Sequence, residues 1–372
     1  MNLIDLIRQN LLARKARSIL TGLAVAIGVL TIVTLGVLTS SLRNTAVSVL
    51  RTGRADFSVA QEGVSDLLYS AVDTNDLDHV RSMDGVESAI GVLVAAAKLD
   101  ADHPLFLKIG VPPDSLAEFG VKVVDGRAYS AHAPNEIMLG YRAAADLGIH
   151  VGCSITIEER TYNVVGIFST GQIFGDKASM LPLTTLQAEE RTPSNLTLLF
   201  VRIKSGIDID KVRKQIEADL PQLATVRTQS DFGRVDRNLI LITAANLGGS
   251  VLALIIGAVG VMNTTLLSFF ERTREFGVLR AIGWSRMRIV ALVIGEAAMV
   301  CLLGAIAGVL LAFGAVRLLT RLPDLLGIFD PTFTAGVFWK ALGFALLMTL
   351  LGAVYPAARA ARREPLEAMR HE

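Results

Sequence analysis

Charged residues are scarce in this sequence, and their scarcity excludes an ordinary soluble protein. Asp, Glu, Lys and Arg make up 19% of the 372 residues, whereas a typical soluble domain contains about 25%. Hydrophobic residues make up 52%, and the mean hydropathy is +0.50. The net charge of +1 lacks the strong basic excess of a nucleic-acid-binding protein. A chain of this composition needs lipid around part of its length.

Cysteine and the patterns of catalytic or metal sites are also scarce or absent. The two cysteines, Cys153 and Cys301, lie far apart, and Cys301 falls in an apolar run, which excludes a disulfide framework and a thiolate metal site. The five histidines form no H-E-x-x-H pattern and no close pair, so we expect no metal site. Neither the nucleophile elbow G-x-S-x-G nor the Walker A pattern G-x-x-x-x-G-K-[ST] occurs. We therefore expect a non-catalytic chain without a cofactor of its own, and any ATP hydrolysis must come from a partner.

Four long apolar runs are present and predict membrane-spanning helices. A helix rises about 1.5 Å per residue and must cross roughly 30 Å of hydrocarbon, so about 20 apolar residues suffice. The first run has no charge between Arg17 and Arg43, and it is too long for the apolar core of a signal peptide, the alternative interpretation, which has about 7 to 15 residues. The four predicted spans are 18–42, 238–270, 289–316 and 334–358.

Lysine and arginine beside these runs predict the orientation, since short loops rich in them stay in the cytoplasm. The loop from Arg317 to Lys340 has few of them, and together with segment 43–237 it is expected outside. We therefore predict a multi-pass protein of the cytoplasmic (inner) membrane with both termini in the cytoplasm, including the tail 359–372. The residues that mark the cytoplasmic side are Arg8, Arg14, Lys15, Arg17, Arg272, Arg274, Arg280, Arg286, Arg288, Arg359, Arg362, Arg363 and Arg370.

Three smaller features belong to the membrane part. Segment 1–17 has apolar residues at helical spacing, which predicts either an amphipathic helix on the cytoplasmic surface or a continuation of the first span. The Gly304-x-x-x-Gly308 spacing is compatible with a helix contact face or with background. Glu296 is the intramembrane acid of the third run, and a carboxylate near the bilayer centre costs roughly 2.5 to 3.5 kcal/mol. We expect Glu296 to reach the interface or to pair with a neighbouring arginine, with a role in packing or coupling rather than in substrate contact.

Segment 43–237, between the first and second spans, has the alternating strand and helix patterns of an α+β domain. Its two ends repeat the order strand, helix, strand, so we predict a membrane-proximal subdomain of 43–119 and 192–237, with 120–191 inserted as a second subdomain. The predicted first helix, 75–83, has Thr74 or Asn75 as its cap. The other predicted elements are strands 55–61, 86–99, 104–110, 136–139, 154–158, 162–168, 196–204 and 224–228 and helices 142–147 and 208–220.

The stretch between the second and third spans mixes charged with apolar residues. It reads GVMNTTLLSFFERTREFGVLRAIGWSRMR over 260–288, and Glu271 and Glu275 stand at positions i and i+4. We predict a short helix there that ends near Gly283, with a charged and an apolar face suited to a groove on another protein. The alternative is a basic loop that only satisfies the positive-inside rule.

This stretch resembles the signature of MacB-type ABC transporter permeases, the superfamily that includes the lipoprotein-releasing permeases and the cell-division permease FtsX. The resemblance extends to RKARSILTGLAVAIGV at 14–29, to VVGI at 164–167, to LPL at 181–183 and to YPAARAARREPLEAMR at 355–370, and so to nearly the whole chain. In that family the stretch includes the coupling helix that docks on the ATPase. The resemblance assigns this role to Glu271, Arg272, Arg274, Glu275, Phe276, Gly277, Leu279, Arg280 and Gly283.

The resemblance also implies partners and a mechanism. It implies a dimer with a second permease copy or paralogue, working with two copies of an ATPase that binds ATP and Mg, for mechanotransmission and export or extraction of a substrate at the outer face. The macrolide exporter of the family carries its ATPase ahead of the first span, whereas only segment 1–17 precedes it here, so we expect a separate ATPase. The alternatives are an FtsX-like regulator that activates an extracytoplasmic cell-wall hydrolase and a receptor unrelated to ABC systems. An adaptor or hydrolase outside the membrane is compatible with this interpretation, and a nucleic acid is not expected.

Overall fold

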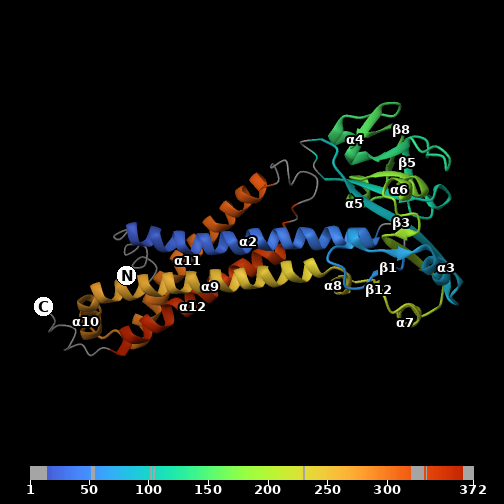
Figure 1. Ribbon diagram of the computed structural model, residues 1–372. Coiled ribbons are helices and arrows are strands. Elements are labelled where there is room, and N and C mark those ends of the chain that lie inside the picture. Colours follow the sequence, from blue (N-terminus) through green and yellow to red (C-terminus); the bar gives the residue numbers. More distant parts are fainter. Residues whose placement is uncertain are drawn as a thin grey trace. The chain divides into compact units, whose positions relative to one another are not determined.

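Four helices among the described residues are long and apolar enough to cross a membrane. The computed structural model describes residues 15–51, 55–100, 103, 105–228, 231–319, 331 and 333–362 (Figure 1). The prediction of four transmembrane helices is confirmed, and the span windows are Lys15–Leu42, Ile240–Glu271, Arg286–Leu319 and Ala335–Ala358. The complete helices are α2 (Lys15–Arg51), α9 (Arg237–Glu271), α11 (Arg286–Leu319) and α12 (Ala335–Arg362).

Some predicted segments lie outside the described residues. They are residues 1–14 of the predicted surface helix, residues 320–330 and 332 of the loop 317–333, and residues 363–372 of the tail.

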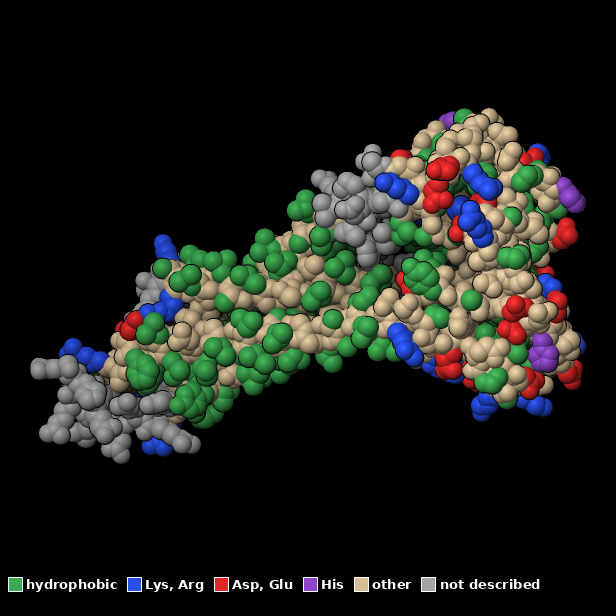
Figure 2. All heavy atoms as spheres, in the orientation of Figure 1, with side chains coloured by type: hydrophobic (Ala, Val, Ile, Leu, Met, Phe, Trp, Pro, Cys, Tyr) green, Lys and Arg blue, Asp and Glu red, His purple; other side chains and the backbone are tan. Residues whose placement is uncertain are grey.

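The chain divides into two compact units. The helical unit contains the described residues of Met1–Thr39, Thr243–Leu319 and Pro331–Glu372, and the strand domain contains those of Ser40–Ile242. Hydrophobic side chains cover the visible side of the helical unit, and charged ones gather over the strand domain and at the α10 end of the helices (Figure 2). An apolar outer surface of this extent on long helices suits contact with lipid.

Glycines allow close contacts between helices inside the helical unit. A Cβ atom added at Gly304 of α11 would lie 2.6 Å from the carbonyl oxygen of Gly22, and one at Gly308 would lie 2.5 Å from that of Ala26. Any larger residue would therefore push α11 away from α2. The Gly304-x-x-x-Gly308 spacing is a contact face, which the sequence alone left open.

The strand domain is built on one sheet with the strand order β12-β1-β11-β3-β4-β9-β6-β8-β5, to which β7 adds by pairing with β8. Its strands are β1 (Phe57–Gln61), β3 (Val86–Ala97), β4 (Phe106–Val111), β5 (Lys122–Gly126), β6 (Glu136–Gly140), β7 (Ser154–Ile157), β8 (Arg160–Ser169), β9 (Ser179–Pro182), β11 (Leu198–Ile203) and β12 (Leu223–Val226). A separate ribbon pairs β2 (Val72–Asp73) with β10 (Asn195–Leu196). The helices are α3 (Thr74–Ser82), α4 (Tyr141–Leu147), α5 (Ile173–Asp176), α6 (Leu183–Glu189), α7 (Ile209–Asp219) and α8 (Phe232–Val235), with 3-10 turns at Leu67–Tyr69 and Pro113–Ser115.

Strands from both ends of the segment share one part of this sheet. β1 lies between β12 and β11, and β11 pairs with the first part of β3. Helices α3 and α7 bury Val80 and Ile216 in one apolar cluster with Phe57 of β1. The last part of β3 pairs with β4, which begins the strands of the middle of the segment. The fold class, an α/β domain inserted between the first transmembrane helix and the others, is therefore as predicted.

Two local predictions need correction. The cap of α3 is Asp73, whose carboxylate accepts a hydrogen bond of 2.7 Å from the Asn75 N–H, so neither Thr74 nor Asn75 is the cap. The strand predicted at 224–228 ends at Val226, because the Asp231 carboxylate accepts hydrogen bonds from the N–H groups of Arg227 and Thr228 and turns the chain.

Candidate functional site

The stretch between the second and third spans forms a short helix, as predicted. α9 ends at Glu271, α10 runs from Thr273 to Ala281, and Arg272 lies between them with φ −108° and ψ 15°. Gly283 follows with φ +100°, a conformation that glycine adopts without strain. The N–H of Gly283 donates to the Arg280 carbonyl and that of Trp284 to the Leu279 carbonyl. This is a Schellman arrangement, and it ends the helix at Ala281, close to the predicted Gly283.

Arg272 occupies the centre of the site. Its side chain is only 5% exposed. Nε donates to the Glu275 carboxylate at 2.7 Å, and one Nη donates to both carboxylate oxygens of Glu296 at 2.8 Å. The guanidinium carbon also lies 5.0 Å from the centroid of the Phe276 ring. Because Arg272 and Glu275 flank the start of α10 and Glu296 belongs to α11, this Arg272 centre (Arg272, Glu275 and Glu296) joins the two helices.

Glu296 is paired, as the sequence analysis anticipated. Its side chain is 17% exposed and lies against Arg272, so its charge is compensated inside the helical unit. Removing one partner of a buried ion pair costs about 3–5 kcal/mol, since the other charge stays buried and uncompensated. The role in packing or coupling that was expected for this acid stays a prediction.

Aromatic and aliphatic side chains hold α10 against the spans. The rings of Phe269 and Phe276 are stacked with centroids 6.0 Å apart. Both are buried in one cluster with Ile289 and Leu292 of α11 and Ala357 of α12. The inner side of α10 is thus fixed to α9, α11 and α12 by packing as well as by charge.

The residues that the resemblance assigned to ATPase coupling fall into two groups. Arg272, Phe276 and Gly277 are buried, and Leu279 and Arg280 are half-buried, with Arg280 donating to the Trp284 carbonyl at 3.2 Å. The exposed members of the set are Glu271, Arg274, Glu275 and Gly283.

Glu271 and Glu275 do not share a helix, although their spacing suggested one. Glu271 is the last residue of α9, and its carboxylate accepts a hydrogen bond of 2.9 Å from Arg17 of α2. The break at Arg272 separates it from α10. Glu271 therefore ties α9 to α2, whereas Glu275 ties α10 to Arg272.

One side of α10 carries exposed residues that the sequence analysis missed. Val278 is 45% and Ile282 is 74% exposed, and both lie in helical register with exposed Arg274 and Ala281. We call these four residues the outer stripe. Their spacing of i, i+4, i+7 and i+8 was available in the sequence, but only the burial of Phe276 and Gly277 shows which side of the helix faces outward.

A cavity of about 250 Å³, lined by both polar and apolar side chains, lies beside the Arg272 centre. Hydroxyl residues from α2 and α9 contribute to its lining, and the hydroxyls of Thr21, Thr264 and Thr265 donate to carbonyls of their own helices. The Arg272–Glu296 pair therefore borders an open space of mixed lining rather than solid packing. Within the described part of the chain, no group of three or more His, Cys, Asp or Glu residues could hold a metal ion.

Two family models match the chain. The MacB-like periplasmic core domain matches residues 18–219, which is more than half of the chain, and the FtsX-like permease C-terminal domain matches residues 247–365. The second match contains α10, Glu296 and the whole outer stripe.

Similar proteins include transport proteins of bacteria and archaea. The macrolide export ATP-binding/permease protein MacB of Agrobacterium fabrum is 27% identical over 96% of this chain, and the alignment covers 58% of that protein. An uncharacterized ABC transporter permease of Methanocaldococcus jannaschii is 26% identical over 68% of this chain and 66% of its own length. This chain thus spans less than two thirds of these relatives. Among solved structures, the periplasmic region of MacB from Actinobacillus actinomycetemcomitans matches 52% of this chain and 94% of that chain at 12% identity and a TM-score of 0.38.

The family agrees with the architecture. Permeases of this kind are the membrane components of ABC transporters. The long match of the first model begins in α2 and continues through the strand domain. With four transmembrane helices, a strand domain inserted after the first of them and both models in place, the chain belongs to the family of MacB- and FtsX-type ABC transporter permeases.

Proposed function

We propose that this chain is the permease subunit of an ABC transporter in which a separate ATPase docks on the outer stripe of α10. ATP-driven movement of the ATPase displaces α10, and the spans carry this displacement to the strand domain, which exports or extracts a substrate at the outer face of the membrane. The observation that carries the proposal is the two-sided character of α10. Its inner side is fixed to the spans by Arg272 and Phe276, and its outer side exposes Val278 and Ile282.

The outer stripe has the chemistry of a docking surface. An amphipathic helix binds a groove through apolar residues at i, i+3 or i+4 and i+7. Val278 and Ile282 provide the apolar contact, and Arg274 lies one turn before Val278. Exposed Arg286 and Arg288 follow at the start of α11. A groove with an apolar floor and acidic residues at its rim would complement this surface.

The Arg272 centre supports transmission of force from α10 to the spans. Its charge-assisted hydrogen bonds are short and directional, and they connect α10 with Glu296 on α11. Stacking of Phe276 on Phe269 connects α10 with α9. A displacement of α10 would therefore move both spans, whereas a flexible connecting loop would absorb it.

The orientation and assembly belong to the same proposal. The arginines around α10 favour a cytoplasmic location of this loop and of both termini, in the cytoplasmic membrane. No Walker A pattern occurs in the 372 residues, which supports a partner that supplies ATP hydrolysis. We propose two ATPase copies and a second permease copy or paralogue. Labelling of cysteines introduced at Ser130 and Ser285 from the two sides of the membrane checks the orientation.

An FtsX-like regulator is the second candidate, and the match of the FtsX-like model to residues 247–365 favours it. In that function the same coupling through α10 would activate a cell-wall hydrolase outside the membrane instead of moving a substrate. Purification of the complex from its native membrane distinguishes the two, since a bound hydrolase supports the regulator and a bound adaptor supports the exporter.

The docking claim is tested by placing a charge on the outer stripe. We expect Val278→Asp with Ile282→Asp to abolish stimulation of the partner ATPase, because carboxylates would enter an apolar contact. Membrane insertion should be unaffected, since both side chains point away from the spans. Val124→Asp is the matched control, because Val124 on β5 is 63% exposed in the strand domain. Unchanged ATPase stimulation in the double variant would refute docking at this surface.

A further inference from the structure

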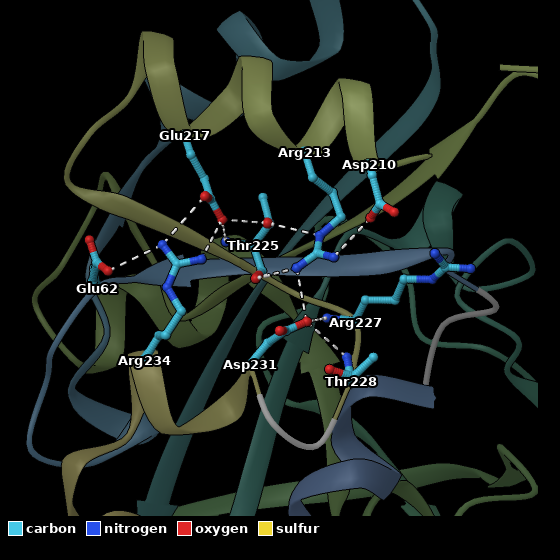
Figure 3. A network of polar contacts seen from close by, with 9 residues as sticks. All are labelled: Glu62, Asp210, Arg213, Glu217, Thr225, Arg227, Thr228, Asp231 and Arg234. Atoms are coloured by element: carbon cyan, nitrogen blue, oxygen red, sulfur yellow. Dashed lines mark hydrogen bonds and ion pairs between the residues drawn. The ribbon is translucent and has the colours of Figure 1, made fainter. Parts of the chain in front are cut away.

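Arg213 of α7 joins three parts of the strand domain (Figure 3). Nε donates to the Thr225 hydroxyl on β12 at 3.0 Å, and one Nη donates to the Asp231 carboxylate at 2.8 Å. The other Nη donates to Asp210 of α7 at 3.2 Å. The side chain is 15% exposed, so these contacts form largely away from water. Arg213 therefore connects α7 and β12 with the residue that directly precedes α8.

Arg234 of α8 makes a second set of contacts next to the first (Figure 3). Its two Nη atoms donate to the two carboxylate oxygens of Glu217 on α7 at 3.0 and 3.3 Å. One of them also donates to Glu62, the residue after β1, at 3.3 Å. A two-pronged guanidinium–carboxylate contact fixes orientation as well as distance. Arg234 thus holds α8 to α7 and to the end of β1.

The two carboxylates that face these arginines also hold the main chain. Asp231 accepts hydrogen bonds from the N–H groups of Arg227 and Thr228 at 3.2 and 3.1 Å. Glu217 accepts one from the N–H of Thr225 at 3.0 Å and one from its hydroxyl at 2.6 Å. Each carboxylate is thereby fixed on two sides, and such shared networks are stiffer than isolated pairs. We call Arg213, Arg234, Glu217 and Asp231 the α9 clamp.

Two of the clamp residues, Asp231 and Arg234, lie a few residues before the start of α9, and the backbone continues the attachment. The N–H of Gly63 donates to the Arg234 carbonyl at 2.9 Å, and the N–H of Arg237 donates to the Val64 carbonyl at 3.1 Å. Val235, between the two, is fully buried in the core of the strand domain. The first residues of α9, Arg237 to Ile242, belong to the same compact unit as the strand domain, and α9 then continues without a break to Glu271 beside α10.

We propose that Arg213 and Arg234 are positioning residues that fix the start of α9 to the strand domain, so that a displacement of α9 at its α10 end moves the strand domain. The inference rests on the proposed function, which supplies the displacement at α10. A continuous helix transmits an axial push only if both of its ends are held. The Arg272 centre and the Phe276 stack hold one end, and the α9 clamp holds the other. Without the clamp, α9 would shift against β12 and the strand domain would stay where it is.

The test measures one distance inside the strand domain of the full chain. Spin labels are placed at Lys214 of α7 and Leu241 of α9, both exposed, after replacement of Cys153 and Cys301 by serine. The protein is studied in lipid nanodiscs with its co-purified ATPase. We expect a single narrow distance that ATP does not change. In the double variant Arg213→Ala with Arg234→Ala, we expect several label-to-label distances instead of one in the absence of nucleotide. Addition of ATP should shift these distances further.

Two variants separate transmission from folding. Arg81→Ala is the matched control, because Arg81 bridges α3 to the Ala89 carbonyl of β3 away from the clamp. It should leave the distance unchanged with and without ATP. Arg213→Lys with Arg234→Lys keeps both charges and is expected to restore a single distance that ATP does not shift. Weakened packing alone would broaden the distance equally in both nucleotide states.

The outcomes separate this inference from the proposed function. An unchanged single distance in the double alanine variant without nucleotide overturns the clamp, whatever the ATPase does. A wild-type distance that shifts with ATP also overturns it, since the start of α9 would then move against α7. A third label at Ser285, beside α10, reports docking. One outcome supports the clamp and refutes docking at α10. In that outcome the label at Ser285 does not respond to ATP, while the double alanine variant shows several distances between the labels at positions 214 and 241 instead of one.

Discussion

The helical unit and the strand domain use arginine in different ways. In the helical unit, Arg272 is 5% exposed, and its side chain donates hydrogen bonds to the carboxylates of Glu275 and Glu296. In the strand domain, Arg213 and Arg234 are 15% and 43% exposed, and their carboxylate partners also bind main-chain N–H groups. The Arg272 centre therefore joins helix to helix through side-chain contacts, whereas the α9 clamp also holds a turn of the backbone.

The difference follows from how the main-chain N–H and C=O groups of each region find hydrogen-bond partners. In long helices the main-chain groups already bond each other, so side chains are left to bind side chains. Between β12 and α8 the chain makes a turn whose N–H groups need partners, and Asp231 provides them. The same residue types thus couple helices in one unit and shape the chain in the other, and we expect their removal to have effects of different size.

The largest effect is expected at the Arg272 centre. Arg272→Ala leaves Glu296 without its buried cation, so the free energy of unfolding of the helical unit should fall by about 3–5 kcal/mol. Denaturant unfolding of the full chain in detergent measures the change. ATPase stimulation should be lost together with the stability. The control is Arg274→Ala, which removes an exposed arginine two residues away and should leave stability nearly unchanged.

Removing both partners of the pair sharpens this prediction. Arg272→Ala combined with Glu296→Ala removes both charges and should recover part of the lost stability, because no uncompensated carboxylate remains. A double variant that is as unstable as the sum of the two single variants would show that the two side chains are not coupled.

A smaller effect is expected at the α9 clamp. Asp231→Asn keeps the shape of the side chain but removes the charge that faces Arg213. It also weakens the hydrogen bonds that this side chain accepts from the N–H groups of Arg227 and Thr228. The free energy of unfolding of the strand domain should fall by about 1–3 kcal/mol. Asp78→Asn, in the exposed pair with Arg81, is the control and should cost less than Asp231→Asn.

The smallest effect concerns acidic pH. Burial alone would raise the pKa of Asp231, but hydrogen bonds from Thr228 and Arg227 and the charge of Arg213 outweigh it, and the pKa of this carboxyl is lowered. Burial likewise opposes the shift at Glu217, where hydrogen bonds from Thr225 and Arg234 lower the pKa. A carboxyl with a lowered folded-state pKa stabilises the fold fully above its unfolded-state pKa, which is about 4, and loses this contribution as the pH falls through the folded-state value.

The strand domain should therefore lose stability below about pH 4 through these two carboxyls. Thermal unfolding of the full chain as a function of pH measures the loss. In Asp231→Asn the dependence should be shallower, because one titrating group is gone. A profile identical to that of the wild-type chain would contradict the lowered pKa of Asp231.

The sequence predicted the elements that depend on local pattern. Long apolar runs predicted the four spans, and Gly283 predicted the end of α10, because both signals act over short distances. The strands β7 and β8, which pair with each other, were also predicted from the sequence pattern at 154–158 and 162–168. The strand β5 was missed because all of its residues are exposed, so it has no alternation to recognise.

Features that depend on tertiary contacts could not be predicted in the same way. The assignment of Glu271 to α9 depends on the backbone at Arg272, and the exposure of Val278 and Ile282 depends on the packing of Phe276. The residues of the α9 clamp resemble ordinary surface charges in the sequence. Apart from the local contacts with Asp210, Arg227 and Thr228, their contacts join residues 8 to 172 positions apart, and only the fold brings such residues together.

The central claim is that the outer stripe of α10 contacts the partner ATPase. The most direct measurement is photo-crosslinking from a reactive amino acid placed at Ile282 in the native membrane, with Val124 as the control position. We predict a cross-linked product between this chain and the ATPase from position 282 and none from position 124. A co-purified ATPase that forms no cross-link from position 282 would contradict the account.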